Sequence, residues 1–277
     1  MSDRTAPSPL IEYPESDGQP MTESDPTRDY LLYCVAVLES YFRSRRQVYV
    51  SGNLFIYYEQ GNPKKVISPD VFVIFGVRKC KRRSYKTWEE GDQLPSFILE
   101  VTSRTTQRQD EVEKPALYER LGVMEYFQYD PTGDYLQPQL KGQRLVNGLY
   151  QPIALQPRSG GFYMHSQELG LDLCLQMPQA IGFSQPAPQP VLPLELRFCD
   201  PKTNSFLLSY QELEEARSQA EMDKLQAEQA LQQATQVQRT AIVRLTVLGL
   251  TAEQIADALS LAVQAVQVIQ SEPEQCE

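Results

Sequence analysis

Two short apolar runs, each carrying one acidic residue, constrain this chain more than any other feature. The first is Ser-Pro-Asp-Val-Phe-Val-Ile at residues 68–74, and the second is Pro-Ser-Phe-Ile-Leu-Glu-Val-Thr-Ser at residues 95–103. Runs this short and rich in Val, Ile and Phe are typical of β-strands. Asp70 then lies near the start of one strand and Glu100 near the middle of another. Because a carboxylate inside an apolar strand is costly unless it is paired or liganded, Glu100 needs a partner.

Two carboxylates on neighbouring strands, with a lysine close by, would form a site for a hard divalent cation. Mg²⁺ prefers oxygen ligands and usually takes one or two protein carboxylates. Asp70 and Glu100 would supply these, and the carbonyl oxygen of Val101 would add a third ligand. Metal-assisted phosphodiester hydrolysis needs such ligands, a positioned water and compensation for charge at phosphorus. The competing interpretation is structural, since an Asp that follows Pro at a strand start is common turn chemistry.

A helical stretch follows the second run and ends near Gly122, which suits a helix C-cap. It carries Asp110, Lys114 and Tyr118. If Asp110 and Lys114 share a helical turn, their i, i+4 spacing puts both on one face. The alternative is a helix that begins at Pro115, with Lys114 at its edge, because proline restricts the residue before it. Taken alone, the Asp–Lys pair would be a surface pair and Tyr118 a core residue.

Several other chemistries are disfavoured by what the sequence lacks. It has neither a Walker-type phosphate loop nor a Gly-x-Gly-x-x-Gly motif. Its single histidine, His165, makes a His-based metal site or a Ser-His-Asp triad a poor hypothesis. Five scattered cysteines without a Cys-x-x-Cys pair favour reduced thiols in a cytoplasm. No secretory signal pattern is present, and the longest apolar stretch near the start, residues 31–38, is far shorter than the roughly 20 residues of a membrane span. We therefore expect a cytoplasmic protein without a membrane segment.

The net charge of −10 is unevenly distributed along the chain. Residues 1–27 carry −5 and residues 209–277 carry −7, whereas the middle, 28–208, carries +2. The bases of the middle region gather in two clusters: Arg43, Arg45 and Arg46, and then Arg78, Lys79, Lys81, Arg82, Arg83 and Lys86. Such clusters either dock phosphates or form a solvated face, and both interpretations stay open.

Composition divides the chain into four parts: 1–27, 28–208, 209–248 and 249–277. The first, rich in Pro, Ser, Asp and Glu, predicts a flexible acidic tail. The second is the main domain. The third, without Gly or Pro, predicts a long helix whose Leu and Ala recur every seven residues. This is a weak coiled-coil pattern, so the helix either pairs with its copy in a homodimer or lies against the domain.

Local signals predict several boundaries inside these parts. We expect a first helix capped by Thr27 or Asp29. Strands at 47–50 and 54–58 would then be joined by a hairpin turn at Ser51-Gly52-Asn53.

The last part predicts short helices followed by a tail. Thr251 and Gln254 have the form of a capping box, and Ser260 would cap a second short helix. This arrangement resembles a helix-turn-helix, but residues 260–270 carry no Arg or Lys, which favours a helical packing unit over DNA reading.

Taken together, these motifs resemble the Uma-two family of restriction endonucleases, which belongs to the PD-(D/E)XK nuclease superfamily. The resemblance covers about 30–208, is strongest over 68–131, and rests on Pro-Asp at 69–70, Glu-Val-Thr-Ser at 100–103, Asp-x-x-x-Lys at 110–114, Tyr118, and the stretch from Gly122-Val123 to Asp130-Pro131. It implies an α/β (α+β) fold: a restriction-endonuclease-like mixed central sheet flanked by helices, with the metal site on one sheet edge. A C-terminal coiled-coil extension is also similar to members of this group.

The resemblance also implies roles for individual residues. Asp70 and Glu100 match the metal-binding acids, but the superfamily places lysine two residues after the second acid, where this chain has Thr102. The resemblance suggests that the lysine has moved to Lys114, which would position the attacking water. Asp110 would orient that lysine or help a second metal, and Thr102 and Tyr118 would support the site.

The expected function is therefore that of a magnesium-dependent endodeoxyribonuclease that hydrolyses DNA phosphodiester bonds, with Mn²⁺ as the alternative ion. The competing hypothesis is a catalytically inactive nuclease-fold protein that acts as an interaction scaffold through its coiled coil. The lysine missing at Thr102 and the low overall basicity favour that alternative.

Overall fold

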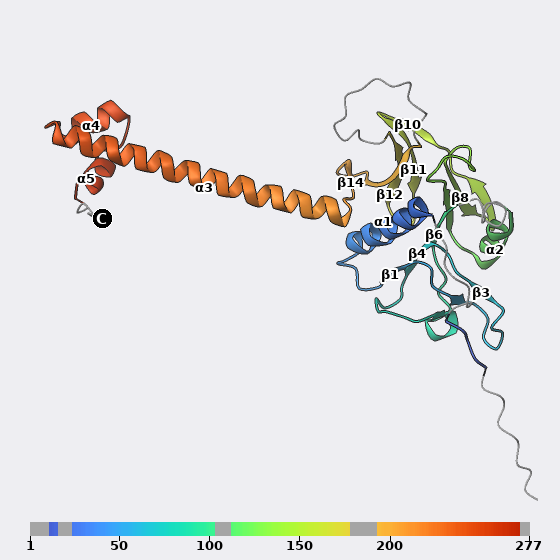
Figure 1. Cartoon of the computed structure of the whole chain (residues 1–277). Helices are drawn as coiled ribbons and strands as arrows, with labels where there is room; N and C mark the ends of the chain where they lie inside the picture. Colours follow the sequence, from blue (N-terminus) through green and yellow to red (C-terminus); the bar gives the residue numbers. More distant parts are fainter. Residues whose placement is uncertain (1–10, 16–23, 103–111, 178–192, 272–277) are drawn as a thin grey trace, which may run out of the picture. The chain divides into compact units, whose positions relative to one another are not determined.

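The computed structural model describes residues 11–15, 24–102, 112–177 and 193–271 (Figure 1). The chain divides into two compact units, Met1–Tyr210 and Gln211–Glu277. Within the described residues, no helix combines the length and apolarity that crossing a membrane requires.

A six-stranded mixed sheet forms the centre of the first unit. Its order is β1 (Val48–Ser51), β4 (Val71–Phe75), β6 (Phe97–Val101), β7 (Glu125–Tyr129), β8 (Leu140–Val146) and β9 (Leu149–Pro152). β6 and β7 run parallel, and the other neighbours are antiparallel. The mixed central sheet expected from the sequence is therefore confirmed.

Two smaller sheets and two helices accompany the central sheet. The three-stranded sheet has the order β3 (Val66–Ile67), β2 (Ile56–Tyr57) and β5 (Tyr85–Lys86), with a 3₁₀ turn, η1, at Thr87–Glu89. The five-stranded sheet consists of β10 (Gln156–Arg158), β11 (Gly161–Ser166), β12 (Leu171–Gln176), β13 (Glu195–Asp200) and β14 (Ser205–Phe206). The helices are α1 (Asp25–Tyr41) and α2 (Lys114–Leu121).

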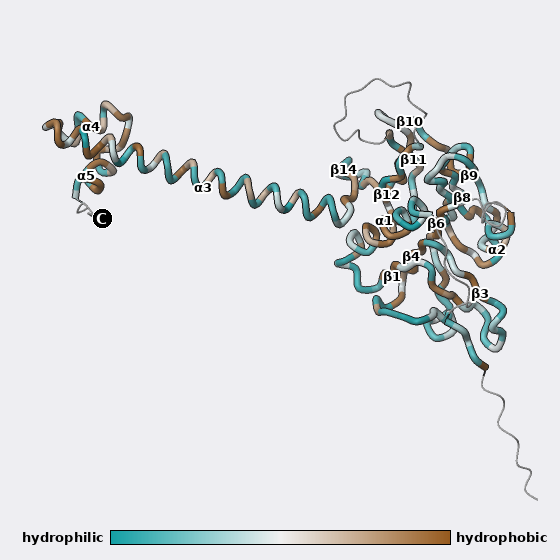
Figure 2. Tube along the Cα trace, viewed as in Figure 1, coloured by the Kyte–Doolittle hydropathy of each residue, from teal (hydrophilic) through white to brown (hydrophobic). Residues whose placement is uncertain are grey.

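The two faces of the central sheet bury different clusters. Val71 and Leu99 point to the face that packs on α1 and the five-stranded sheet. Phe72 and Ile98 point to the other face, which packs on α2 and the three-stranded sheet. Figure 2 shows brown, hydrophobic residues along the strands near β1 and β4. Since side chains alternate along a strand, Glu100 lies in phase with Ile98 and therefore faces α2.

The connection from β6 to β7 explains why α2 lies over this face. Parallel neighbours need a crossover, and the chain passes through α2 between the two strands. Gly122 ends α2 in the left-handed region at φ 79°, which confirms the predicted C-cap. The helix begins at Lys114, so this residue opens the first turn and Pro115 follows it.

The start of α1 differs from the prediction. Ser24 is the N-cap, and its hydroxyl accepts a hydrogen bond from the Thr27 N–H at 3.4 Å. Thr27 and Asp29 lie inside the helix, so neither is the cap. Pro26 accounts for the earlier start, because its fixed φ suits the first helical turn. Residues 25–27 are thus helical rather than part of the tail expected over 1–27.

The hairpin predicted at Ser51-Gly52-Asn53 is wrong. β1 pairs with β4, whereas β2 pairs with β3 and β5 in a different sheet. Asn53 has φ 48°, and its N–H donates to the Pro69 carbonyl oxygen at 3.0 Å. The turn residues therefore carry the chain from one sheet to another and pack against the residues that precede β4.

The second unit is helical, as predicted. It contains α3 (Tyr210–Val247), α4 (Ala252–Leu259) and α5 (Val263–Ser271). The capping box of Thr251 and Gln254 is confirmed by both of its hydrogen bonds, at 3.4 and 2.9 Å. Ser260 is instead the C-cap of α4 at φ 54°.

A small buried cluster joins the three helices of this unit. It consists of Ile242 from α3, Ile255 and Ala256 from α4, and Val266 from α5. The helical packing unit expected at this end is therefore present, while pairing of α3 with a copy stays a prediction.

Candidate active site

Asp70 and Glu100 meet between β4 and β6. Val71 pairs with Leu99 in the antiparallel ladder, so one further step sets Asp70 opposite Glu100. The Val101 N–H donates to Asp70 Oδ2 at 2.8 Å, and the Asp70 N–H donates to Glu100 Oε2 at 3.3 Å. Two acids thirty residues apart in the sequence therefore lie side by side in the sheet. They lie on inner strands, whereas the site was expected at an edge of the sheet.

Gly52 allows the Asp70 backbone to approach this closely. A Cβ atom at Gly52 would lie 2.2 Å from the Asp70 carbonyl oxygen and 3.1 Å from a Val35 methyl carbon. The sequence assigned Gly52 to a hairpin turn and missed this contact. Its only signal was a glycine beside Asn53, which is equally typical of an ordinary turn.

Glu100 is fully buried, with an exposed fraction of 0%. The Lys114 Nζ lies 2.9 Å from its Oε2, and the Tyr118 hydroxyl donates to its Oε1 at 2.8 Å. Lys114 and Tyr118 are one helical turn apart on α2, so both reach the same carboxylate. The buried acid thus has an ionic partner and a neutral donor, as its position in an apolar strand requires.

Burial and mutual repulsion control protonation at this site. Burial, followed by the negative charge of Glu100, raises the pKa of the half-buried Asp70 well above its ordinary value, although Lys114 and the Val101 N–H oppose this. The pKa of Tyr118 is likewise raised well above 10 by burial and by Glu100, so Tyr118 is a phenol that donates. With both acids ionised, two negative charges face one ammonium group, and a cation is favoured there.

The remaining predicted residues have different positions. Thr102 is buried, and its N–H donates to the Tyr129 carbonyl oxygen at 2.8 Å. Its hydroxyl has no hydrogen-bond partner among the residues that the structure describes. The Val101 side chain packs in the core on the α1 side, and the role of its carbonyl oxygen stays a prediction. Asp110 lies outside the described residues. Among those described, no three His, Cys, Asp or Glu side chains meet, so Asp70 and Glu100 are the acids of this site.

Gln128 is a neighbour that the sequence analysis missed. It is buried in β7 and pairs with Glu100 across the parallel ladder. Cross-strand partners point to the same face, so the side chains of Gln128 and Glu100 are neighbours on the face toward α2. The available signal was an amide in the middle of the apolar strand Glu-Tyr-Phe-Gln-Tyr, since buried polar side chains normally have a specific partner.

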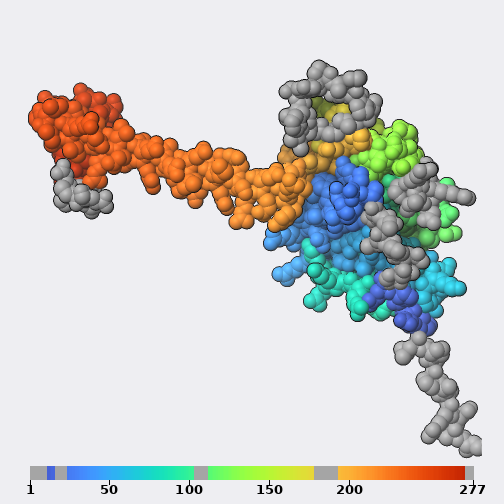
Figure 3. Space-filling model, in the orientation of Figure 1, coloured from blue at the N-terminus to red at the C-terminus, as the bar shows by residue number. Residues whose placement is uncertain are grey.

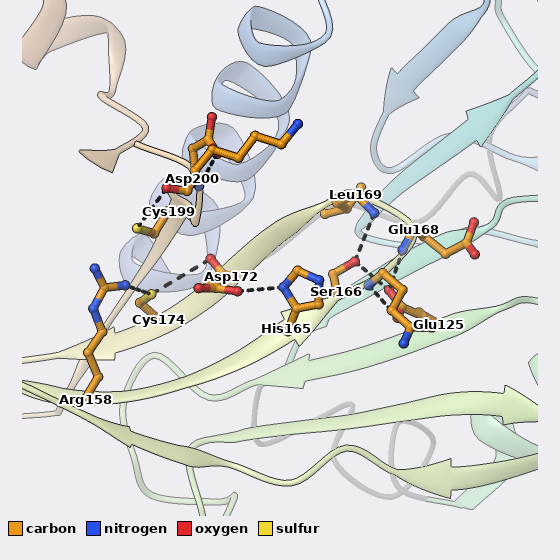
Figure 4. A network of polar contacts seen from close by, with 12 residues as sticks. Glu125, Arg158, His165, Ser166, Glu168, Leu169, Asp172, Cys174, Cys199 and Asp200 are labelled. Atoms are coloured by element: carbon orange, nitrogen blue, oxygen red, sulfur yellow. Dashed lines mark hydrogen bonds and ion pairs between the residues drawn. The ribbon is translucent and has the colours of Figure 1, made fainter. Parts of the chain in front are cut away.

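A second polar cluster, drawn in Figure 4, serves to join the two larger sheets. Glu125 of β7 is buried and accepts hydrogen bonds from the Ser166 hydroxyl and from the Gln167 N–H at 2.9 Å, and it pairs with Arg144 at 2.7 Å. His165 Nδ1 pairs with Asp172 Oδ1 at 2.7 Å. Ser166 bonds to Glu125 rather than to His165, so these residues do not form a catalytic triad.

Two comparisons with known proteins gave matches. The Uma2 family model, described as "Putative restriction endonuclease", matches residues 5–176. A crystal structure described as a putative nuclease belonging to DUF820 from Anabaena variabilis is 15% identical, with a TM-score of 0.36, and the match covers 50% of this chain and 74% of that one. No curated protein matches the chain. The family match covers more than half of the sequence, including Asp70, Glu100 and Lys114, and the chain therefore belongs to the Uma2 family.

Proposed function

We propose that this chain is a divalent-metal-dependent endodeoxyribonuclease whose active site is the cluster of Asp70, Glu100 and Lys114. The observation that carries the proposal is that two carboxylates meet at the β4–β6 pair, with a lysine ammonium 2.9 Å from one of them. Membership of a restriction endonuclease family supports DNA as the substrate.

The donor set fits a hard cation. Asp70 and Glu100 offer carboxylate oxygens, and the carbonyl oxygen of Val101 is our candidate for a third ligand. No described His or Cys joins the cluster, which argues against a zinc site. Mg²⁺ usually keeps several waters and takes one or two protein carboxylates, so two acids suffice, and Mn²⁺ accepts similar ligands.

Each residue has a distinct part in the proposed reaction. A bound divalent ion supplies charge neutralisation at phosphorus and a lower pKa for its coordinated water. Asp70 and Glu100 would hold the cation, while the Lys114 ammonium would orient the attacking water. That water would form the new P–O bond in line with the P–O bond that breaks. The products would be a phosphate monoester and an alcohol, with the proton lost by the water balancing the one gained by the leaving oxygen. Tyr118 keeps the Glu100 carboxylate in one orientation by donating to Oε1.

The inactive-scaffold hypothesis loses part of its support. It rested on the missing lysine at Thr102, yet a lysine ammonium reaches Glu100 from α2 instead. We propose a role for Asp110 as well, either in orienting Lys114 or in holding a second cation.

Two further parts of the proposal concern the whole protein. We propose a homodimer through α3, where Leu213, Leu231 and Val237 are exposed large apolar side chains. Sedimentation over a range of protein concentrations tests this, and a monomer at all concentrations contradicts it. The four described cysteines are free thiols, which supports a cytoplasmic location.

Nicking of supercoiled plasmid tests the proposed activity. We expect nicking with Mg²⁺ or Mn²⁺, none with EDTA, and at least about a hundredfold loss in Asp70→Asn, Glu100→Gln and Lys114→Ala. Asp172→Asn is the control, because it removes a carboxylate that pairs with His165 away from the site. Activity that survives both chelation and the three substitutions would refute the mechanism.

A further inference from the structure

Two basic segments that are separate in the sequence form one surface. The Lys79 N–H donates to the Arg46 carbonyl oxygen at 3.2 Å, and the Gly76 N–H donates to the Gln47 carbonyl oxygen at 2.9 Å. In Figure 3 the segments near residues 45 and 80 are neighbours on the globular unit. We call this the basic surface, and its exposed members are Arg43, Arg45, Arg46, Arg78, Lys79 and Lys81.

Arg82 holds this surface together rather than belonging to it. Its guanidinium lies 4.3 Å from the Tyr49 ring centroid and pairs with Glu90 at 2.8 Å. It also donates to the carbonyl oxygens of Arg78 and Cys80, at 2.9 and 3.0 Å. The side chain that is turned inward therefore fixes the loop from which its basic neighbours project.

The remaining bases of the second cluster are engaged with acids. Arg83 pairs with Glu15 at 2.7 Å, and Lys86 pairs with Glu89 at 3.1 Å. By contrast, the six members of the basic surface have no carboxylate partner among the described residues. Residues 28–208 carry only +2 in all, so the rest of that region is net negative and the positive charge is concentrated here.

The chemistry of the basic surface matches a phosphate backbone. None of the exposed large apolar residues of the described chain lies within 43–47 or 76–81, whereas a protein partner normally needs an apolar or aromatic anchor at the centre of its interface. Closely spaced exposed arginines and lysines suit a polyanion. They contact phosphate groups and do not distinguish base sequences.

We infer that the basic surface binds the phosphate backbone of duplex DNA at a position separate from the proposed cleavage site. β4 begins just after Asp70 and ends at Phe75, next to Gly76, so about six strand residues, or about 20 Å, separate the site from this surface. A duplex that enters the site would thus be held at a second point. This inference rests on the proposed function, because it takes DNA as the substrate.

Binding can be tested without cleavage. We would measure the affinity of a fluorescent 25-base-pair duplex by anisotropy, in EDTA, for the full chain carrying Glu100→Gln. A variant of this chain also carries three charge reversals together, Arg46→Glu, Lys79→Glu and Lys81→Glu. These should weaken binding at least about tenfold and reduce the slope of log K against log salt by about 2.7. In the matched control, Lys64, Lys65 and Lys202 are replaced by Glu instead. These lysines are also exposed, and their replacement changes the net charge by the same amount.

Each result decides the inference. An unchanged affinity, an equal loss in the control, or tighter binding of poly-L-glutamate than of DNA would overturn it, the last by assigning the surface to an acidic protein. Loss of binding confined to the basic-surface variant would support it even if the wild type nicks no plasmid, so the two proposals fail separately. Thermal melting checks that every variant is folded.

Cys80 offers an independent readout. It is exposed between Lys79 and Lys81, whereas Cys34, Cys174 and Cys199 are buried. We expect the duplex to slow alkylation of Cys80 several-fold, as followed by mass spectrometry of its peptide. Protection should disappear at high salt, and an unprotected Cys80 at saturating DNA would contradict binding at this surface.

Discussion

The Lys114 ammonium lies 2.9 Å from Glu100 Oε2, and this contact joins the first residue of α2 to the penultimate residue of β6. The Glu100 side chain is fully buried, while that of Lys114 is 23% exposed. The pair therefore forms at the boundary of the core, where one partner depends on the other for its charge balance.

Removing Lys114 should destabilise the metal-free protein. Lys114→Ala leaves a buried carboxylate without its ammonium, which we expect to cost about 2 kcal/mol, less than a fully buried pair because Lys114 is partly exposed. Urea unfolding measures this. Lys86→Ala, which breaks the more exposed pair with Glu89, should cost only about 0.5 kcal/mol. Equal losses in the two variants would show that burial does not strengthen the Lys114 contact.

Asp70 should make the metal-free protein less stable as the pH rises. Burial and Glu100 raise its pKa, so above about pH 4 the folded state keeps a proton that the unfolded state has released. The free energy of unfolding then falls as pH rises from there through the folded pKa of Asp70. Asp70→Asn should flatten this part of the curve and be at least as stable as the wild type near neutral pH.

Thermal melting from pH 4 to 8 in EDTA provides the measurement. Asp134→Asn, at an exposed position, is the control for loss of one charge. If Asp70→Asn and the wild type lose stability in parallel over this range, the proton is not held at Asp70.

Gly52 should matter for activity as well as for stability. In Gly52→Ala the new Cβ would lie 2.2 Å from the Asp70 carbonyl oxygen, so the Asp70 backbone must shift from its present position relative to Glu100. Gly161→Ala is a matched control, because its Cβ would meet the Leu175 carbonyl oxygen at 1.9 Å, on strands away from the site. We expect both to lower the melting temperature but only Gly52→Ala to lower kcat for nicking, about tenfold or more. Equal kcat values for the two folded variants would dismiss Gly52 as a positioning residue.

The sequence predicted those parts of the site that strand alternation controls. An acid in phase with Ile98 inside an apolar strand has to face a partner, and this singles out Glu100 from the sequence alone. The helix end at Gly122 followed equally well from local chemistry, because the C-cap needs a left-handed residue.

The parts that the sequence could not predict depend on long-range pairing. Nothing local distinguishes a hairpin at Gly52 from a crossing between sheets, because the choice of β4 as the partner of β1 is made by packing. The position of Gln128 beside Glu100 follows only from the β6–β7 register, and the proximity of the two basic segments follows only from the Lys79–Arg46 contact.

Thr102 gives the last prediction, because its buried hydroxyl lacks a hydrogen-bond partner among the described residues. Thr102→Val keeps the shape and removes the hydroxyl, so the metal-free protein should be as stable as the wild type or about 1 kcal/mol more stable. Ser166→Ala is the contrast, since its buried hydroxyl donates to Glu125 and its loss should cost about 2 kcal/mol. Urea unfolding compares the two. If Thr102→Val keeps full stability but loses nicking activity, the hydroxyl acts on metal or substrate; if it loses stability like Ser166→Ala, the hydroxyl is already satisfied in the folded protein.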